Sequence, residues 1–348
     1  MTLYNKKVLL VAGNIDKESI SFEHVHFYIN LKKIVSDIKK FDFRKKESEH
    51  GNEKMQTKLI EYVSQFKPDF TIVFIQEHEF LPSTIIQLNQ HTKTIAYLYD
   101  DPWRMNYSTF WSKYYNYITT SDINGVRKFN NLGVFNVIYS PFFSDTSIYR
   151  KLYCNKEYDV SFFGGYHPVR EWFYKELKNV GIKVNMFGPG WKNNEMLETE
   201  ELVNIINKSK IILNLSNSLS WDIRQLLLTR YKKFPLNNIR LIRENIKHYS
   251  GVKDRKDLEM IKMRTFEISA CGTAQISFYS EGLELFFDIG KEIIIYTSLN
   301  DLIEKVKYFL NNDGELEKIS NNSYNRFLKD HTAELRLRKL IDELIILN

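Results

Sequence analysis

The 348-residue sequence is poor in cysteine, glycine and proline. It contains 14 glycines and 7 prolines, where average usage would give roughly 24 and 17, so collagen-like and proline-rich chains are excluded. Its two cysteines, Cys154 and Cys271, cannot build a disulfide framework, and neither has a cysteine or histidine at metal-ligand spacing. We expect two reduced thiols and no metal site.

Long hydrophobic runs are also missing. The longest apolar stretches, such as residues 8–12, are far shorter than the roughly 18 residues that cross a bilayer. The first seven residues have no small-residue cleavage site of the kind that follows a signal peptide. We therefore expect no transmembrane segment and a cytoplasmic location. With 43% hydrophobic and 26% charged residues, the chain is globular and long enough for two domains.

Short runs rich in Val, Ile, Phe and Tyr alternate with longer segments of helical period, a pattern typical of an α/β fold with parallel sheets. In the first half the pattern predicts strands over 7–12, 70–75, 93–99, 115–120 and 136–139, with helices over 22–40, 54–66, 82–90 and 123–131. In the second half it predicts strands over 158–163, 183–187, 210–215, 273–277 and 292–295, helices over 169–178, 200–208 and 265–270, and three closing helices from about residue 302.

An aperiodic stretch over 140–156, rich in Pro, Ser, Asp and Asn, predicts a hinge. The sequence thus predicts two doubly wound, Rossmann-like domains, 1–145 and 146–348, which face each other across a cleft. Ligands bind such sheets at the carboxyl ends of their strands, so we expect the functional residues there.

Positive charge is concentrated in one segment of the second domain. Residues 219–262 carry 11 Lys and Arg against 5 Asp and Glu, a surplus equal to the formal net charge of +6 of the whole chain. The segment resembles two amphipathic helices. It predicts either a surface for an anionic ligand or a solvated helical hairpin.

Gly164 and Gly165 follow the predicted strand 158–163, and Arg170 lies in the helix that comes next. Paired glycines let a backbone approach an anion, a helix N-terminus offers free N–H groups, and an arginine adds two hydrogen bonds. This arrangement indicates a diphosphate site. The alternative is an ordinary tight turn with a solvated arginine.

Two further features suit a nucleotide. The turn Gly188-Pro189-Gly190-Trp191 exposes an aromatic face on which a base could stack, or else packs Trp191 into the core. Glu267, in the predicted helix 265–270, has the chemistry to accept hydrogen bonds from a ribose diol. The alternative for Glu267 is a salt bridge with Arg264 on the same helix.

Asp100 and Asp101 follow the strand predicted over 93–99. Two carboxylates at a strand's carboxyl end are costly to leave unsolvated unless they bind something. They are candidates for a general base that takes a proton from an attacking hydroxyl, or for ligands of a nucleotide-bound metal. Helix capping by Asp101 is the structural alternative.

These motifs together resemble the CgeB-type (spore maturation protein) glycosyltransferases. The resemblance covers most of residues 94–345 and is carried by the blocks 99–102, 159–165, 187–191, 264–272, 281–292 and 330–332. It implies the GT-B architecture, with a nucleotide-sugar donor held mainly by the C-terminal domain.

By this resemblance Glu267 would bind the donor ribose, Gly165 and Arg170 would meet the diphosphate, and the loop 188–191 would contact the base. Glu259 lies eight positions before Glu267, the spacing of the two glutamates of retaining relatives, and would face the donor sugar. The architecture generally works without a metal, so the resemblance implies a UDP-sugar as co-substrate, no cofactor, and a base or positioning role for the aspartates.

The predicted function is a glycosyltransferase that moves a sugar from a nucleotide-diphosphate donor to a hydroxyl acceptor, with Arg170 and Arg264 stabilising the leaving group. The acceptor is expected to be of the anionic or surface glycan type, bound by Arg240, Arg243 and Lys247 of the basic segment. The alternatives are a transferase acting on hydroxymethylated DNA bases, and a non-catalytic nucleotide-binding module of the same fold.

Overall fold

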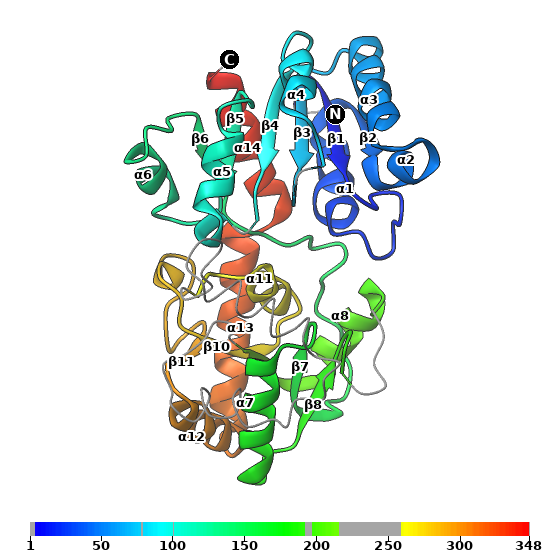
Figure 1. The fold of residues 1–348 in the computed structure, drawn as a ribbon. Helices are drawn as coiled ribbons and strands as arrows, with labels where there is room; N and C mark the ends of the chain where they lie inside the picture. The colour runs from blue at the N-terminus through cyan, green and yellow to red at the C-terminus, as the bar shows by residue number, and fades with distance from the viewer. Residues whose placement is uncertain (1–3, 78, 100, 192–196, 216–258, 348) are drawn as a thin grey trace, which may run out of the picture. The chain divides into compact units, whose positions relative to one another are not determined.

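The computed structural model describes residues 4–77, 79–99, 101–191, 197–215 and 259–347 (Figure 1). The chain divides into two compact units, a first unit of residues 1–145 with 333–348, and a second unit of residues 146–332. The last helix, α14 (Ala333–Ile346), thus belongs to the first unit, whereas the sequence prediction left it in the second domain. The reason is packing, because Leu337, Leu340 and Leu344 of α14 complete one core of the first unit.

The first unit is built on a six-stranded parallel sheet with the order β2-β1-β3-β4-β5-β6. Its central strands are apolar and buried along their length, as expected where helices cover both faces of a sheet. The strands are β1 (Tyr4–Ala12), β2 (Val35–Asp42), β3 (Phe70–Phe74), β4 (Lys93–Tyr97), β5 (Tyr117–Thr120) and β6 (Val137–Tyr139).

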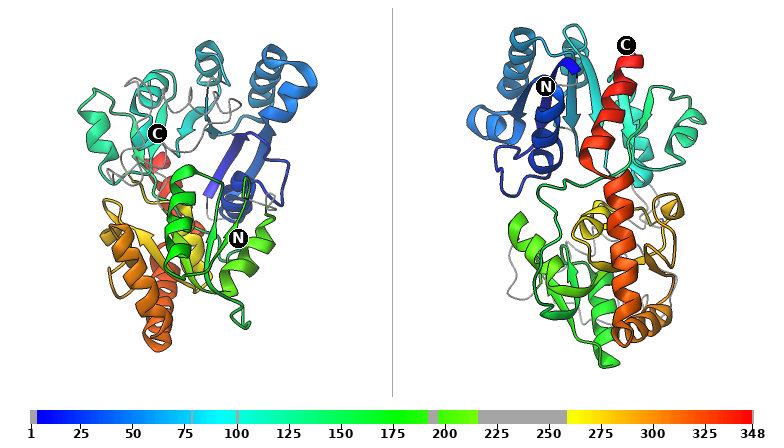
Figure 2. Two further views of the ribbon diagram at one scale, coloured as in Figure 1. Left: turned by 60° about the horizontal axis from the view of Figure 1, so that its bottom comes forward. Right: turned by 180° about the vertical axis from the view of Figure 1, so that it is seen from behind.

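Helices cover both faces of this sheet (Figure 2). One face packs against the π-helical turn η1 (His24–Tyr28), α1 (Ile29–Ile34) and α14. The other face packs against α2 (Phe43–His50), α3 (Asn52–Phe66), α4 (Pro82–Leu88), α5 (Met105–Trp111) and α6 (Gly125–Asn130), and the short turn η2 (Asp101–Trp103) precedes α5. In α3 the buried residues Met55, Leu59 and Val63 recur every four positions, which sets the face of the helix that meets the sheet.

The single long helix predicted over 22–40 is wrong, because its last six residues, 35–40, belong to strand β2. Leu31, Ile34 and Ile38 have the spacing of one face of a helix. Because of this spacing, the predicted helix was extended into residues that form a strand. β2 is an edge strand that pairs only with β1, and its exposed positions are polar. Strand pairing here overrides the local pattern.

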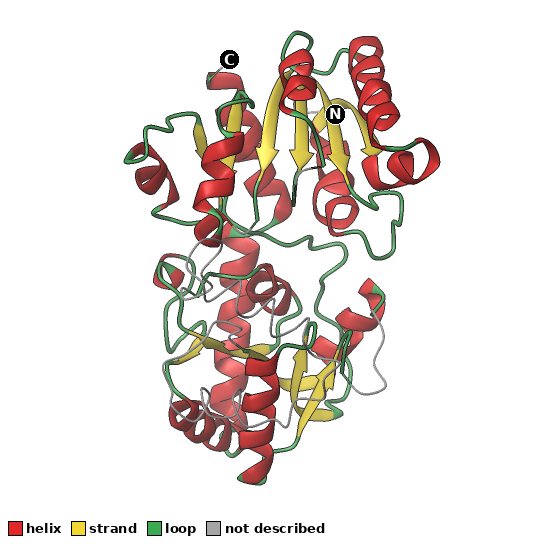
Figure 3. Ribbon diagram, in the orientation of Figure 1, coloured by secondary structure: helices red, strands yellow, loops and turns green. Residues whose placement is uncertain are grey.

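The second unit contains a five-stranded parallel sheet with the order β11-β10-β9-β7-β8 (Figure 3). The strands are β7 (Tyr158–Phe163), β8 (Val184–Phe187), β9 (Ser209–Asn214), β10 (Ala274–Phe278) and β11 (Ile294–Tyr296). The helical elements are α7 (Pro168–Asn179), α8 (Thr199–Asn207), α11 (Met263–Ala270), η4 (Leu283–Leu285), α12 (Leu299–Leu310) and α13 (Asp313–Asp330).

Both sheets are doubly wound, which confirms the predicted α/β fold class. In the second unit the strand order reverses between β7 and β9. Such a switch point leaves a crevice at the carboxyl ends of its two strands, where this class of sheet binds ligands. None of the helices in the described ranges combines the length and the hydrophobicity needed to span a membrane.

Candidate functional site

The loops that follow β7 and β8 pack backbone against backbone. The Gly164 N–H donates to the Phe187 carbonyl at 2.9 Å, and the Tyr166 N–H donates to the Pro189 carbonyl at 2.8 Å. Gly188 has a φ of 116°, and a Cβ on it would lie 2.8 Å from the Gly164 carbonyl oxygen. Gly188 is therefore required by the close approach of the two loops.

Trp191 joins the same two loops. Its indole N–H donates to the Gly164 carbonyl at 2.8 Å, and its ring centroid lies 5.3 Å from that of Tyr166. Gly190 has a φ of 84° and makes room for Tyr166, whose Cβ would lie 2.8 Å from a Cβ at position 190. The half-buried Trp191 thus packs at the edge of the core, and base stacking on it stays a prediction.

Gly165 differs from the other glycines of these loops. A Cβ built on it would meet only the Pro189 carbonyl oxygen, at 4.0 Å, and its φ lies outside the left-handed range. Neither packing nor backbone conformation therefore requires glycine at this position. A missing side chain here leaves the backbone open to close approach by a ligand.

Two arginines from different helices meet at the end of β7. The guanidinium carbons of Arg170 and Arg264 lie 5.2 Å and 5.4 Å from the ring centroid of Phe162. Arg170 Nη1 donates to the Gly165 carbonyl at 2.7 Å, and Arg264 Nη1 donates to the Phe163 carbonyl at 2.9 Å. Gly164 is needed for this arrangement, because a Cβ on it would lie 2.8 Å from Arg264 Nη2.

The two like charges are attracted by Glu259 and Glu267 but are not in ion-pair contact with either carboxylate. Arg170 is 7% exposed, and burial together with the neighbouring Arg264 lowers the pKa of Arg170. Among the described residues neither guanidinium forms an ion pair with a carboxylate, and Arg170 Nε has no hydrogen-bond partner. Guanidinium groups keep their protons at neutral pH, so the pair offers the positive charge and the N–H donors that an anion would need, and the diphosphate site stays a prediction.

A third cation, Lys262, lies at the start of α11. Its ammonium is paired with Glu259 and donates to the Leu215 carbonyl at 3.3 Å, just beyond the end of β9. Burial is the main cause that lowers the pKa of Lys262 to about 8, and Arg264 and Arg170 add to it. The sequence analysis counted Lys262 in the basic segment 219–262 but did not name it as a site residue. Its spacing of three residues from Glu259 and of two from Arg264 was the signal available in the sequence.

Polar side chains pack together beside Lys262 at the end of β9. They include Asn214, Glu259, Thr265 and Ser277. Asn214 donates to Thr265 Oγ1 at 3.0 Å, but its side-chain oxygen is buried without a hydrogen-bond partner. The switch point between β7 and β9 thus gathers three cations and an unsatisfied polar group.

Glu267 is on the same helix, which is buried from Thr265 to Ala270. Its carboxylate is 8% exposed and is hydrogen-bonded to the Tyr149 hydroxyl, whose pKa is raised well above its usual value by burial and by Glu267. Glu267 also attracts the Arg264 guanidinium electrostatically. The ribose-binding role of Glu267 stays a prediction.

The start of α7 contributes less than the sequence predicted. Pro168 has no N–H, and the Val169 N–H donates to His167 Nδ1 at 3.3 Å. The Glu171 N–H donates to the His167 carbonyl at 3.0 Å. Side-chain cations therefore dominate the anion site, and the helix N-terminus adds little.

Several predicted residues cannot be located. Asp100, Arg240, Arg243 and Lys247 lie outside the described residues, as does most of the basic segment 219–262. Asp101 begins the short turn η2, and its side chain is also outside the description. In the part of the chain that the structure describes, no three His, Cys, Asp or Glu side chains are grouped so as to hold a metal ion.

Comparisons with known proteins show which family and which fold this chain is similar to. Residues 170–342 match the family described as glycosyl transferase-like. The spore protein CgeB of Bacillus subtilis is 21% identical over 292 residues, which cover 78% of this chain and 81% of CgeB. The predicted resemblance to CgeB-type proteins is therefore confirmed.

Two solved structures share the fold. The structure of HepE from Anabaena in complex with UDP and glucose superposes with a TM-score of 0.62 at 8% identity, over 98% of this chain and 99% of HepE. Sucrose-phosphate synthase from Thermosynechococcus elongatus gives a TM-score of 0.63 at 9% identity, over 99% of this chain and all of the other (100%). The fold is GT-B, as the sequence predicted.

Proposed function

We propose that this chain, which carries a glycosyl transferase-like domain over residues 170–342 and resembles CgeB, transfers a sugar from a nucleotide-diphosphate donor to a hydroxyl acceptor. One observation carries the proposal. Arg170 and Arg264 lie over the same ring at the switch point of the second unit, and among the described residues no carboxylate is in ion-pair contact with either, although Glu259 and Glu267 attract them electrostatically. A diphosphate would neutralise this pair, and the crevice is where such sheets bind nucleotides.

The leaving group explains why several cations are useful. As the bond between the anomeric carbon and the phosphate oxygen breaks, the nucleotide diphosphate gains negative charge. Arg170, Arg264 and Lys262 would stabilise that charge from fixed positions, which is where electrostatic catalysis is most effective. The acceptor oxygen forms the new bond to the anomeric carbon, and its proton passes to a base, for which we propose Asp100 or Asp101.

The nucleotide proposed is UDP, because HepE, which shares the fold, has been solved in complex with UDP. In this proposal Glu267 binds the ribose diol, the loop of Gly188, Gly190 and Trp191 faces the base, and Glu259 acts near the donor sugar. For the acceptor we propose a glycan-type hydroxyl compound bound with the help of Arg240, Arg243 and Lys247.

The test is a calorimetric titration of the full chain with UDP, GDP, CDP and TDP. We expect one nucleotide to bind, and Arg264→Gln to weaken its binding ten- to a hundredfold, as removal of about 1.5–3 kcal/mol of charge-assisted hydrogen bonding predicts. Gln keeps an N–H donor for the Phe163 carbonyl that Arg264 contacts, and thermal unfolding of the variant checks that it is folded before its affinity is compared.

Arg150→Gln is the matched control, since Arg150 lies in the same unit and pairs with Glu200 on the surface, where its side chain is 42% exposed. Its affinity for the nucleotide should equal that of the wild type. Equal affinity in Arg264→Gln, or no binding of any of the four nucleotides, would contradict the proposal.

A further inference from the structure

The sheet of the first unit has its own switch point, between β1 and β3. The chain leaves β1 through η1 and α1 on one face and reaches β3 through α2 and α3 on the other. Sheets of this class bind ligands at the carboxyl ends of the strands on either side of such a point. The residues that follow β1, and those that follow the neighbouring strands, are therefore candidates for a second site.

Glu23 is a buried carboxyl group at this edge of the sheet. It is 8% exposed, and its two oxygens accept from the Ser21 hydroxyl at 3.4 Å, from the Tyr99 hydroxyl at 3.2 Å and from its own backbone N–H. Among the described residues it has no lysine or arginine partner. Burial raises the pKa of Glu23, an effect that its own backbone N–H, the two hydroxyls and the nearby His26 reduce.

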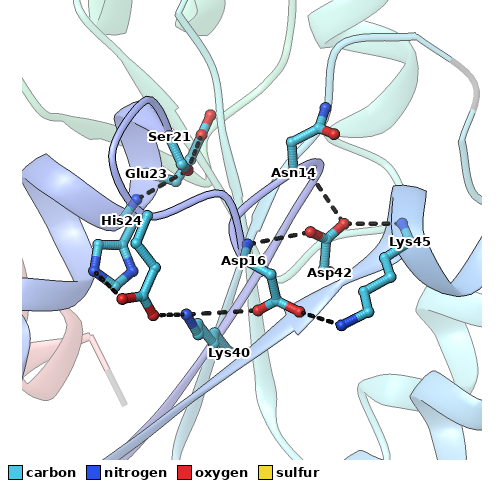
Figure 4. A network of polar contacts seen from close by, with 9 residues as sticks. Asn14, Asp16, Ser21, Glu23, His24, Lys40, Asp42 and Lys45 are labelled. Atoms are coloured by element: carbon cyan, nitrogen blue, oxygen red, sulfur yellow. Dashed lines mark hydrogen bonds and ion pairs between the residues drawn. The ribbon is translucent and has the colours of Figure 1, made fainter. Parts of the chain in front are cut away.

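Other acidic groups of the same unit are treated differently. Asp42 accepts from three backbone N–H groups, those of Asn14, Asp16 and Lys45, at 3.0–3.2 Å. Figure 4 shows Ser21 and Glu23 at one end of a network that continues through His24 to the ion pairs of Lys40 and Asp16. A carboxylate has about four acceptor positions, so Glu23, with its own N–H and two side-chain hydroxyls as donors, keeps room for a further hydroxyl. The donors to Asp42 are all backbone N–H groups, which serve the fold.

The surroundings hold Glu23 in place. The Ser21 hydroxyl, besides contacting Glu23, accepts from the His24 N–H at 3.3 Å. The Tyr99 ring is stacked on Phe74 at 5.8 Å and meets the edge of Phe22 at 5.2 Å, which fixes the direction of its hydroxyl. The next turn, η1, is π-helical, a rare geometry that occurs often at functional sites.

We infer that Glu23, together with Ser21 and Tyr99, binds a hydroxyl group of the sugar acceptor. The inference rests on the proposed function and names the part of the chain that holds its second substrate. A carboxylate that is contacted by neutral hydroxyls, without a neighbouring lysine or arginine, repels anions and accepts hydrogen bonds from hydroxyl donors. The ligand class is therefore a neutral polyol such as a glycoside.

The experiment measures the rate at which the protein releases nucleotide from a nucleotide sugar. The sugar donor is chosen to carry the nucleotide that binds in the titration above. The probes are glycerol and the methyl glycosides of glucose, galactose, mannose and N-acetylglucosamine. We expect at least one probe to stimulate release. Glu23→Gln should raise the KM of that probe tenfold or more, while the Kd of the nucleotide stays unchanged. Tyr99→Phe should raise the KM of the probe by a smaller factor.

Glu18→Gln is the matched control. Glu18 belongs to the neighbouring ion-pair network, where its side chain is 62% exposed and pairs with Lys40. The KM of the probe for Glu18→Gln should therefore equal that for the wild type. An unchanged KM in both Glu23→Gln and Tyr99→Phe, or no stimulation by any neutral probe, would overturn the inference. Failure of the proposed function would show differently, as a wild-type chain that binds no nucleotide.

Discussion

Replacing Gly165 with alanine separates the needs of the fold from those of the ligand. A methyl group at this position would meet only the Pro189 carbonyl oxygen at 4.0 Å, an ordinary contact distance, and the backbone is not left-handed. Alanine at such a site reduces the freedom of the unfolded chain, so the variant should be as stable as the wild type or more stable by about 0.4–1 kcal/mol.

The effect on the donor should be the opposite. If the diphosphate lies against the Gly165 backbone beside Arg170, a methyl group there removes the close approach that its hydrogen bonds need. Loss of one or two charge-assisted hydrogen bonds costs about 1.5–3 kcal/mol, which is a ten- to hundredfold increase in Kd. A stable protein with weakened binding is therefore the expected result.

Two other glycine variants serve as controls for this measurement. Gly314→Ala, in α13, also has nothing within 4 Å of the new methyl group, so it should be at least as stable as the wild type and bind UDP normally. Gly188→Ala should instead unfold at a lower temperature, because its methyl group would lie 2.8 Å from the Gly164 carbonyl. Thermal unfolding and UDP calorimetry on all three decide the matter. Unchanged UDP affinity in Gly165→Ala would refute the reasoning.

Two further predictions concern the cations and the proposed ribose contact. The pKa of Lys262 is about 8. UDP affinity should therefore fall about tenfold from about pH 7 to about pH 9, because the lysine of the unliganded protein loses its proton over this range. Lys262→Met should remove this pH dependence. Because this pKa lies below the unfolded value of about 10.4, the unfolded chain binds more protons between the two values, and the contribution of Lys262 to stability rises with pH there, which unfolding titrations can check. Glu267→Gln should weaken UDP binding by about 1.5–3 kcal/mol but leave uridine-free pyrophosphate binding unchanged, and equal losses for both ligands would argue against a ribose contact.

Much of the fold could be predicted from the sequence because its strands are short, buried and apolar. The strand predicted over 158–163 coincides with β7, and both sheets are parallel as expected. The errors lie in segments whose secondary structure or domain is set by tertiary contacts. β2 carries a helical spacing but pairs with β1, and α14 packs on the sheet of the first unit although it follows the second unit in sequence.

The candidate site was predictable only in part. The glycines and arginines could be selected from their positions after strands, but their separate roles depend on backbone geometry. Gly164 and Gly188 are required by packing, whereas Gly165 is not. Lys262 was not selected as a site residue because its burial, its contact with the Leu215 carbonyl after β9 and its closeness to Arg170 of α7 depend on tertiary packing.

The central claim is that the second unit binds a nucleotide diphosphate at the end of β7 and the start of α11. Hydrogen–deuterium exchange of the full chain, with and without saturating UDP, tests this most directly. We predict slower exchange in peptides that cover residues 163–170 and 259–267, and little change over the strands of either sheet. Protection confined to the first unit, or none in either of those segments while UDP is bound, would contradict the account.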